Sequence, residues 1–99
     1  MALRHVVLFG FADQVGSETK NDVARRFAAL QQSVPGVEAL EWGVNSSPEG
    51  LSHGHSHVFV LTFGSDEARD AYLIHPRHVA FSDWVKPFLA SVTVVDYWT

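Results

Sequence analysis

The segment of residues 3–11 is apolar on both of its faces and constrains the fold more than any other part of the chain. Its side chains are mostly aliphatic or aromatic, which is typical of a strand that is covered on both faces and not exposed to water on one of them. His5, Val7 and Phe9 share one face, because side chains alternate along a strand. A sheet built around this segment therefore has to be covered on both sides.

The size and composition of the chain predict self-association. The 99 residues are enough for one small domain, residues 1–99. Hydrophobic residues make up 46% of the chain and aromatic residues 12%, which is more apolar surface than one small domain readily buries. There is no cysteine, so neither a disulfide nor a thiolate metal site can stabilise the fold. We therefore expect a homodimer.

Charge and hydropathy exclude two classes of partner. Charged residues are only 18% of the chain and the net charge is -4, so there is no basic patch to bind the phosphates of a nucleic acid. No apolar run approaches the ~20 residues that span a bilayer, and no signal-type segment opens the chain. We expect a soluble, cytoplasmic protein.

Helical spacing follows the first strand. Ser17 is expected to cap a helix, and Glu18 suits the positive end of its dipole. Pro35 and Gly36 are expected to end it. The apolar residues that recur at helical spacing are Val23, Phe27, Leu30 and Val34.

The remaining elements complete a βαββαβ order. They are expected as a strand at about 37–44, a loop over 45–54, a strand at 55–63, a short helix at 66–72, a second helical segment through residue 88 after a break at His75 and Pro76, and a strand at 92–98. This order predicts an α+β, ferredoxin-like fold with an antiparallel sheet and helices on one face. Two such sheets are expected to pack face to face in the homodimer.

Residues 72–81 are the candidate for chemistry. They combine a tyrosine, two histidines and a helix-breaking proline in a largely apolar stretch. An imidazole such as His78, held by the turn at Pro76, can accept and return a proton, and the Tyr72 hydroxyl can hold a carbonyl oxygen as charge develops on it. A merely structural, half-buried Tyr72 and His78 pair is an equally open interpretation. We assign His75 to the helix break, with its imidazole capping a backbone carbonyl.

Seven short blocks, in order along the chain, carry a family resemblance. They are residues 5–9, 34–37, 41–43, 47–51, 57–63, 72–78 and 94–98. Together they resemble the stress-responsive A/B barrel domain (Dabb) family of small dimeric α+β barrels. The resemblance implies that fold, but it leaves open whether the chain is an enzyme, because many members have no known reaction.

The resemblance also implies a site. The family includes a plant polyketide cyclase that closes an aromatic ring by aldol condensation without a cofactor, and neither a cofactor nor a metal is expected here. Its catalytic pair falls on Tyr72 and His78. Its supporting pocket residues fall on His5, His57 and Asp96. If the last strand lies antiparallel beside the first, Asp96 comes close to His5 and can orient it.

Three residues depart from the cyclase pattern. Phe27 stands where the cyclase has a tyrosine, and Phe59 stands where a smaller aliphatic residue is expected. Arg77 adds a cation beside His78, which either lowers the basicity of the imidazole or binds an acidic substrate. The alternating histidines at 53, 55 and 57 have a spacing that can bind a metal, but a solvated loop is the better interpretation of the first two.

Two functional hypotheses of different classes follow. The first is a cofactor-independent lyase or polyketide cyclase-like enzyme that acts on a small carbonyl-rich or aromatic molecule by acid–base chemistry. The second is a noncatalytic dimer, either a stress-response protein or a small-ligand-binding protein, and it predicts a filled interior with no pocket. A subunit that assists a separate synthase is a weaker third possibility.

Overall fold

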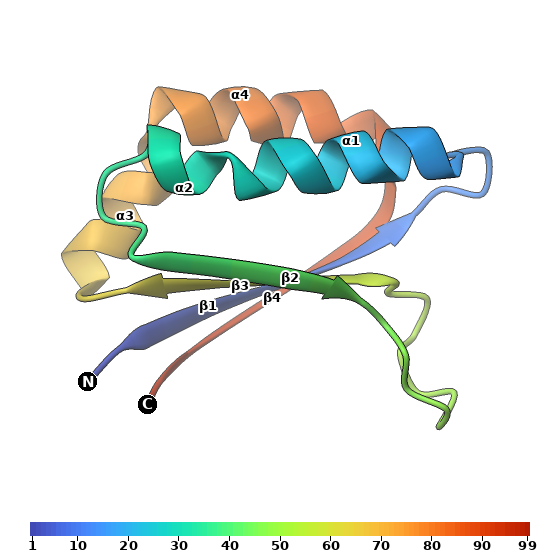
Figure 1. Ribbon diagram of the computed structural model, residues 1–99, viewed down its shortest axis with the longest axis horizontal. Helices are drawn as coiled ribbons and strands as arrows, with labels where there is room; N and C mark the ends of the chain where they lie inside the picture. Colours follow the sequence, from blue (N-terminus) through green and yellow to red (C-terminus); the bar gives the residue numbers. More distant parts are fainter.

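The computed structural model describes residues 1–99 as one four-stranded sheet with helices on one of its faces (Figure 1). The elements are, in order, β1 (Leu3–Phe11), α1 (Ser17–Ala28), α2 (Leu30–Ser33), β2 (Ala39–Val44), β3 (His57–Phe63), α3 (Asp66–Ile74), α4 (Pro76–Val85), the 3-10 turn η1 (Lys86–Phe88) and β4 (Leu89–Trp98). The predicted ferredoxin-like α+β fold is confirmed. None of the helices has the length and hydropathy that a membrane span requires.

The strands are ordered β2-β3-β1-β4 and every neighbouring pair is antiparallel. β1 lies in the middle, which explains why it is apolar on both faces. In the register of the sheet, His5 of β1 is opposite Leu61 of β3 and Asp96 of β4. The predicted antiparallel pairing of the first and last strands is therefore confirmed.

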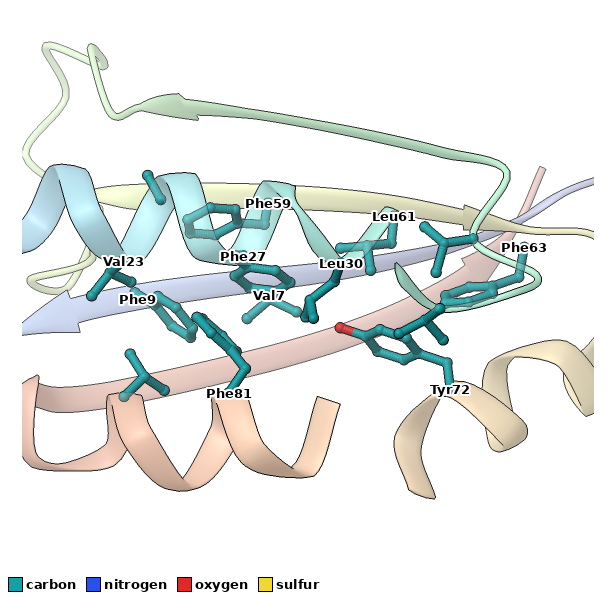
Figure 2. Close-up of a cluster of buried hydrophobic side chains, with 14 of the residues drawn as sticks. Val7, Phe9, Val23, Phe27, Leu30, Phe59, Leu61, Phe63, Tyr72 and Phe81 are labelled. Carbon is teal, nitrogen blue, oxygen red and sulfur yellow. The ribbon is translucent and has the colours of Figure 1, made fainter. Parts of the chain in front are cut away.

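The core lies between the helices and one face of the sheet, and aromatic side chains fill its centre (Figure 2). Phe59 of β3 is fully buried and stacks on Phe27 of α1, with ring centroids 4.2 Å apart. Phe81 of α4 also packs on Phe27, with centroids 4.9 Å apart. Tyr72 extends from α3 toward this cluster, with its hydroxyl pointing inward (Figure 2). One contiguous core thus joins the sheet to all four α-helices.

The first helix differs in detail from the prediction. Its apolar positions are buried as expected, but Gly16 is the N-cap residue and Ser17 is already helical, so the predicted cap at Ser17 is wrong. The helix is divided at Ala29 into α1 and the single turn α2. Gly36 follows with a φ of 94°, a left-handed conformation that glycine adopts without strain and that ends the helical segment.

Three strands start at other residues than predicted, and the first of them, β2, begins at Ala39 where a start at about residue 37 was expected. β3 begins at His57 and not at residue 55, because His53 and Gly54 have positive φ values of 54° and 81° and turn the chain just before it. β4 begins at Leu89, three residues before the predicted start, because its pairing with β1 continues through a β-bulge at Gly10 and Phe11.

The face of the sheet that is turned away from the helices is uncovered (Figure 1). The alternation along the strands and their register place a set of apolar side chains on it. They are Val6, Leu8, Val58, Val60, Val95 and Tyr97. We call this set the open sheet face.

Candidate active site

A cavity of about 670 Å³ lies between the sheet and the helices. It has the size of an ordinary small-molecule site. The noncatalytic hypothesis predicted a filled interior, and this cavity contradicts that part of it. Val92 and Val94 of the edge strand β4 line the cavity and are each 51% exposed, so the cavity opens along β4. Its polar lining residues are His5, Arg69, Asp70, Tyr72, His78, Ser82, Lys86 and Asp96.

Tyr72 lines the cavity and carries a buried, neutral hydroxyl. The residue is fully buried, and its hydroxyl is the only buried side-chain polar atom without a hydrogen-bond partner in the protein. Burial raises the pKa of the Tyr72 phenol well above its usual value, because the charged phenolate would be poorly solvated there. An unpaired buried donor is unfavourable for folding and is therefore a candidate for binding a ligand oxygen.

His78 presents a neutral imidazole beside Tyr72. The two rings are in contact, with centroids 4.4 Å apart. Nδ1 of His78 lies 3.0 Å from the backbone carbonyl of Leu73. A carbonyl oxygen only accepts, so Nδ1 carries the proton and Nε2 is left as the basic nitrogen. Burial and the nearby His5 lower the pKa of His78, partly opposed by the Leu73 hydrogen bond. The ring is therefore ready to accept a proton at neutral pH.

A chain of polar contacts from three elements forms one wall of the cavity. His5 of β1 is buried, and its Nδ1 lies 2.7 Å from Oδ1 of Asp96 on β4. Oδ2 of the same carboxylate accepts a 2.8 Å hydrogen bond from Arg69 of α3. The predicted orientation of His5 by Asp96 is thus present. Arg69 was not identified from sequence, although it precedes Tyr72 by one helical turn and so lies on a similar face of α3.

His57 lies apart from this group. We predicted His57 as a supporting residue of the pocket, but it does not line the cavity. It is paired with Val44 and Phe9 in the sheet, and its ring stacks on Trp42 of the edge strand. Burial, with a contribution from Lys20, lowers the pKa of His57. Its surroundings are therefore those of a packed core imidazole.

His75 and Arg77, on either side of Pro76 at the helix break, do not line the cavity. His75 is the N-cap of α4, as its Nδ1 accepts a hydrogen bond from the backbone N–H of Arg77 at 3.1 Å. The predicted capping role is present, but the partner is an N–H group and not a carbonyl. Arg77 faces a separate surface depression together with Trp84. Neither a lowered basicity of His78 nor binding of an acidic substrate can therefore be ascribed to Arg77.

His55, in the loop before β3, is occupied by protein contacts. His55 bonds the backbone carbonyl of Ser52 through Nδ1 and the hydroxyl of Thr93 through Nε2. Nowhere in the chain do three His, Asp or Glu side chains converge as a metal site requires. Both ring nitrogens of His55 are therefore engaged by the protein.

Comparison with known proteins identifies the family. A family model described as the Stress responsive A/B Barrel Domain matches residues 3–99. The chain belongs to this family. The stress-response A/B barrel domain-containing protein HS1 of Arabidopsis thaliana is 36% identical over 95 residues, which are 96% of this chain and 87% of that relative. The olivetolic acid cyclase of Cannabis sativa is 28% identical over 97 residues, which are 98% of this A/B barrel chain and 96% of the cyclase.

Solved structures show the same A/B barrel fold. A dimeric ferredoxin-like protein from Thermobifida fusca has a TM-score of 0.82 at 25% identity and covers 100% of this chain and 92% of its own. The hydroxynitrile lyase from Passiflora edulis has a TM-score of 0.90 at 21% identity, with 97% and 91% covered. At that identity the lyase supports the fold alone. The relatives of this chain therefore include both an enzyme and a protein named only for a stress response, and the choice between the two functions depends on the site.

Proposed function

We propose that this A/B barrel protein is a cofactor-independent enzyme of the lyase or cyclase type that acts on a small carbonyl-rich or aromatic molecule. The main support is the unpaired, buried hydroxyl of Tyr72, a residue that lines the cavity and whose ring is in contact with the neutral ring of His78. A donor and a base in one apolar cavity are what proton abstraction next to a carbonyl requires. The likeness to olivetolic acid cyclase supports the same class of reaction.

The two residues would divide the reaction between them. A carbon between two carbonyl groups is already acidic, so Nε2 of His78 is basic enough to remove its proton. The electron pair of the broken C–H bond moves into an enolate, whose oxygen accepts a hydrogen bond from Tyr72. The enolate carbon then forms a C–C bond to a distant carbonyl carbon of the same molecule. The resulting alkoxide takes the proton back from the His78 imidazolium, and no further group is consumed.

A histidine-detected NMR titration tests whether Tyr72 and His78 share a ligand site. We expect 2,4-dihydroxybenzoate, a product-like probe, to shift the ring signals of His78 in the wild type. The shift should weaken in Tyr72→Phe, because the hydroxyl that binds the probe oxygen is gone. The six histidines of the chain give few enough ring signals for assignment.

The fold of the variant is not at risk in this test. Removal of a buried hydroxyl without a protein partner is expected to leave the free energy of unfolding unchanged or to raise it by ~1–3 kcal/mol. Tyr97→Phe is the matched control, since Tyr97 is half exposed on the open sheet face and its loss should not alter the His78 shift. If no histidine signal moves up to millimolar probe, the noncatalytic dimer becomes the better hypothesis.

We also infer that the protein is a homodimer through the open sheet face. Val6 is at the centre of this face, paired with Val60 on one side and Val95 on the other. Sedimentation equilibrium should give two copies per particle for the wild type and one for Val6→Asp, because a carboxylate cannot be buried there unpaired. Val44→Asp, on the other face at the edge of the sheet, should remain dimeric. A wild type that sediments as one copy would refute the inference.

A further inference from the structure

Arg69 connects α3 to the edge strand β4 beside the reactive end of the cavity. Its guanidinium donates to Asp96 of β4 at 2.8 Å and to Asp70 of its own helix at 2.9 Å. Asp66, one turn earlier, lies 3.5 Å away. The Arg69 side chain is 21% exposed and lines the cavity. Its hydrogen bonds to Asp70 and Asp96 raise the pKa of Arg69, so it is a permanent cation at this position.

The Asp96 carboxylate is shared between two donors. Oδ2 accepts from Arg69, which leaves Oδ1 for Nδ1 of His5 at 2.7 Å. An ionised carboxylate only accepts hydrogen bonds, so the His5 proton must be on Nδ1 when the ring is neutral. Nε2 of His5 then carries a lone pair and makes no hydrogen bond to the protein, while the ring lines the cavity.

We propose that Arg69 is a positioning residue that fixes Asp96 and thereby holds His5 with an unprotonated Nε2 toward the cavity, as a second proton acceptor. The catalytic part of this proposal rests on the proposed function. Arg69 acts in two ways, since it fixes the rotation of the carboxylate and cancels its charge.

The His5 ring and the His78 ring both lie near the Tyr72 ring. The Tyr72 ring is 6.0 Å from the His5 ring and 4.4 Å from the His78 ring, measured between centroids. The cavity thus presents one hydroxyl donor with two basic nitrogens near it. A cyclisation that ends in an aromatic ring removes protons from carbon more than once. With two neutral imidazoles, the second removal need not wait until His78 has lost its first proton.

The protonation state of His5 can be measured without any substrate. In protein with ¹⁵N-labelled histidine, at about pH 8.5, roughly two units above the ordinary imidazole pKa, we expect wild-type His5 to be protonated on Nδ1 alone. In Arg69→Gln the Nε2 signal should lose its unprotonated position, because an Asp96 carboxylate that can rotate no longer holds the proton on Nδ1 and the two tautomers mix. Arg69→Lys keeps the positive charge but lacks the planar set of guanidinium N–H donors, and it should recover part of the wild-type pattern. The charged or titratable groups that face His5 are Asp96 from β4, Arg69 and Tyr72 from α3, and His78 from α4.

Arg77→Gln is the matched control, because Arg77 lies on α4 outside the cavity, and its His5 spectrum should equal that of the wild type. An unchanged His5 spectrum in Arg69→Gln would overturn the positioning role, even if His78 proves catalytic. If His78 proves inert but the His5 tautomer still depends on Arg69, the positioning role stands and only the proposed reaction fails. Where turnover is measurable, Arg69→Gln should lower kcat less than loss of His78 does and should leave KM nearly unchanged.

Discussion

His78→Ala is expected to lower kcat by about 100- to 10,000-fold for any poly-β-ketone that the wild type converts, the range that a positioned general base contributes. Nε2 of His78 is the proposed base, and its ring contacts Tyr72 inside the cavity. The substitution removes the base and leaves the Tyr72 donor in place, so KM should change much less than kcat. The measurement is steady-state kinetics on a panel of linear poly-β-ketone thioesters.

The pH profile of the wild type is an internal check on the same assignment. Only the neutral imidazole can accept a proton, and burial lowers the pKa of His78 below its ordinary value of 6.5. As pH falls, kcat/KM should therefore decline only below pH 6.5. Because burial raises the pKa of Tyr72 above its ordinary value of 10.0, the phenol should cause no loss below pH 10.

Acid unfolding has to be separated from this decline. His57 and His78 are both kept neutral by burial, so the folded state loses stability as pH falls below 6.5 and the unfolded chain binds protons more readily. Circular dichroism at each pH distinguishes the two effects. His53→Asn is the matched variant, because this loop histidine has a φ of 54°, which asparagine tolerates, and its activity should be unchanged. Full activity in His78→Ala would exclude the proposed base.

The order of the elements along the chain and the ferredoxin-like fold could be predicted because the signals behind them are local. An apolar run on both faces marks β1 as a central strand, and the order of elements then restricts the topology to a few possibilities. The ends of elements depend on contacts that the sequence does not display. Gly16 caps α1 in place of Ser17, and the start of β3 is set by the backbone of His53 and Gly54.

The site residues also differ in whether local sequence signals could predict their positions. Asp96 could be placed next to His5 because strand register alone brings them together. Arg69 and Asp96 are 27 residues apart and meet only when α3 docks beside the edge strand, which no spacing in the sequence reveals. His57 shares the helix-facing side of the sheet with His5, but it lies four residues further along the β1–β3 ladder, at the end away from the cavity's polar group.

Phe59→Ala is expected to lower the free energy of unfolding by about 3–5 kcal/mol, a large part of the stability of a domain of this size. The ring is fully buried, stacks on Phe27 at 4.2 Å and contacts Phe9 at 5.3 Å between centroids. Phe27 lines the cavity but Phe59 does not, so Phe59 supports the cavity wall from behind. Phe59 is bulkier than the residue that the family pattern leads us to expect at this position, and it limits the volume of the cavity indirectly, through Phe27. Chemical denaturation at one fixed protein concentration measures the loss, since dimerisation would otherwise change the apparent stability.

Benzene binding and substrate preference in Phe59→Ala show whether Phe27, in the cavity wall, stays in place or moves when the Phe59 ring is removed. If the wall is rigid, Phe59→Ala leaves an enclosed apolar void that benzene can fill, so added benzene should restore part of the stability while turnover of poly-β-ketones keeps its chain-length preference. If Phe27 moves into the space left by the Phe59 ring, the cavity becomes larger by that volume. Benzene should then have no effect on stability, and poly-β-ketones with longer alkyl tails should be accepted as substrates. Phe88→Ala is the matched control, because this phenylalanine is only partly buried against the core and should cost less stability in either case. A loss for Phe59→Ala no larger than that for Phe88→Ala would mean that the Phe59–Phe27 stack does not support the wall.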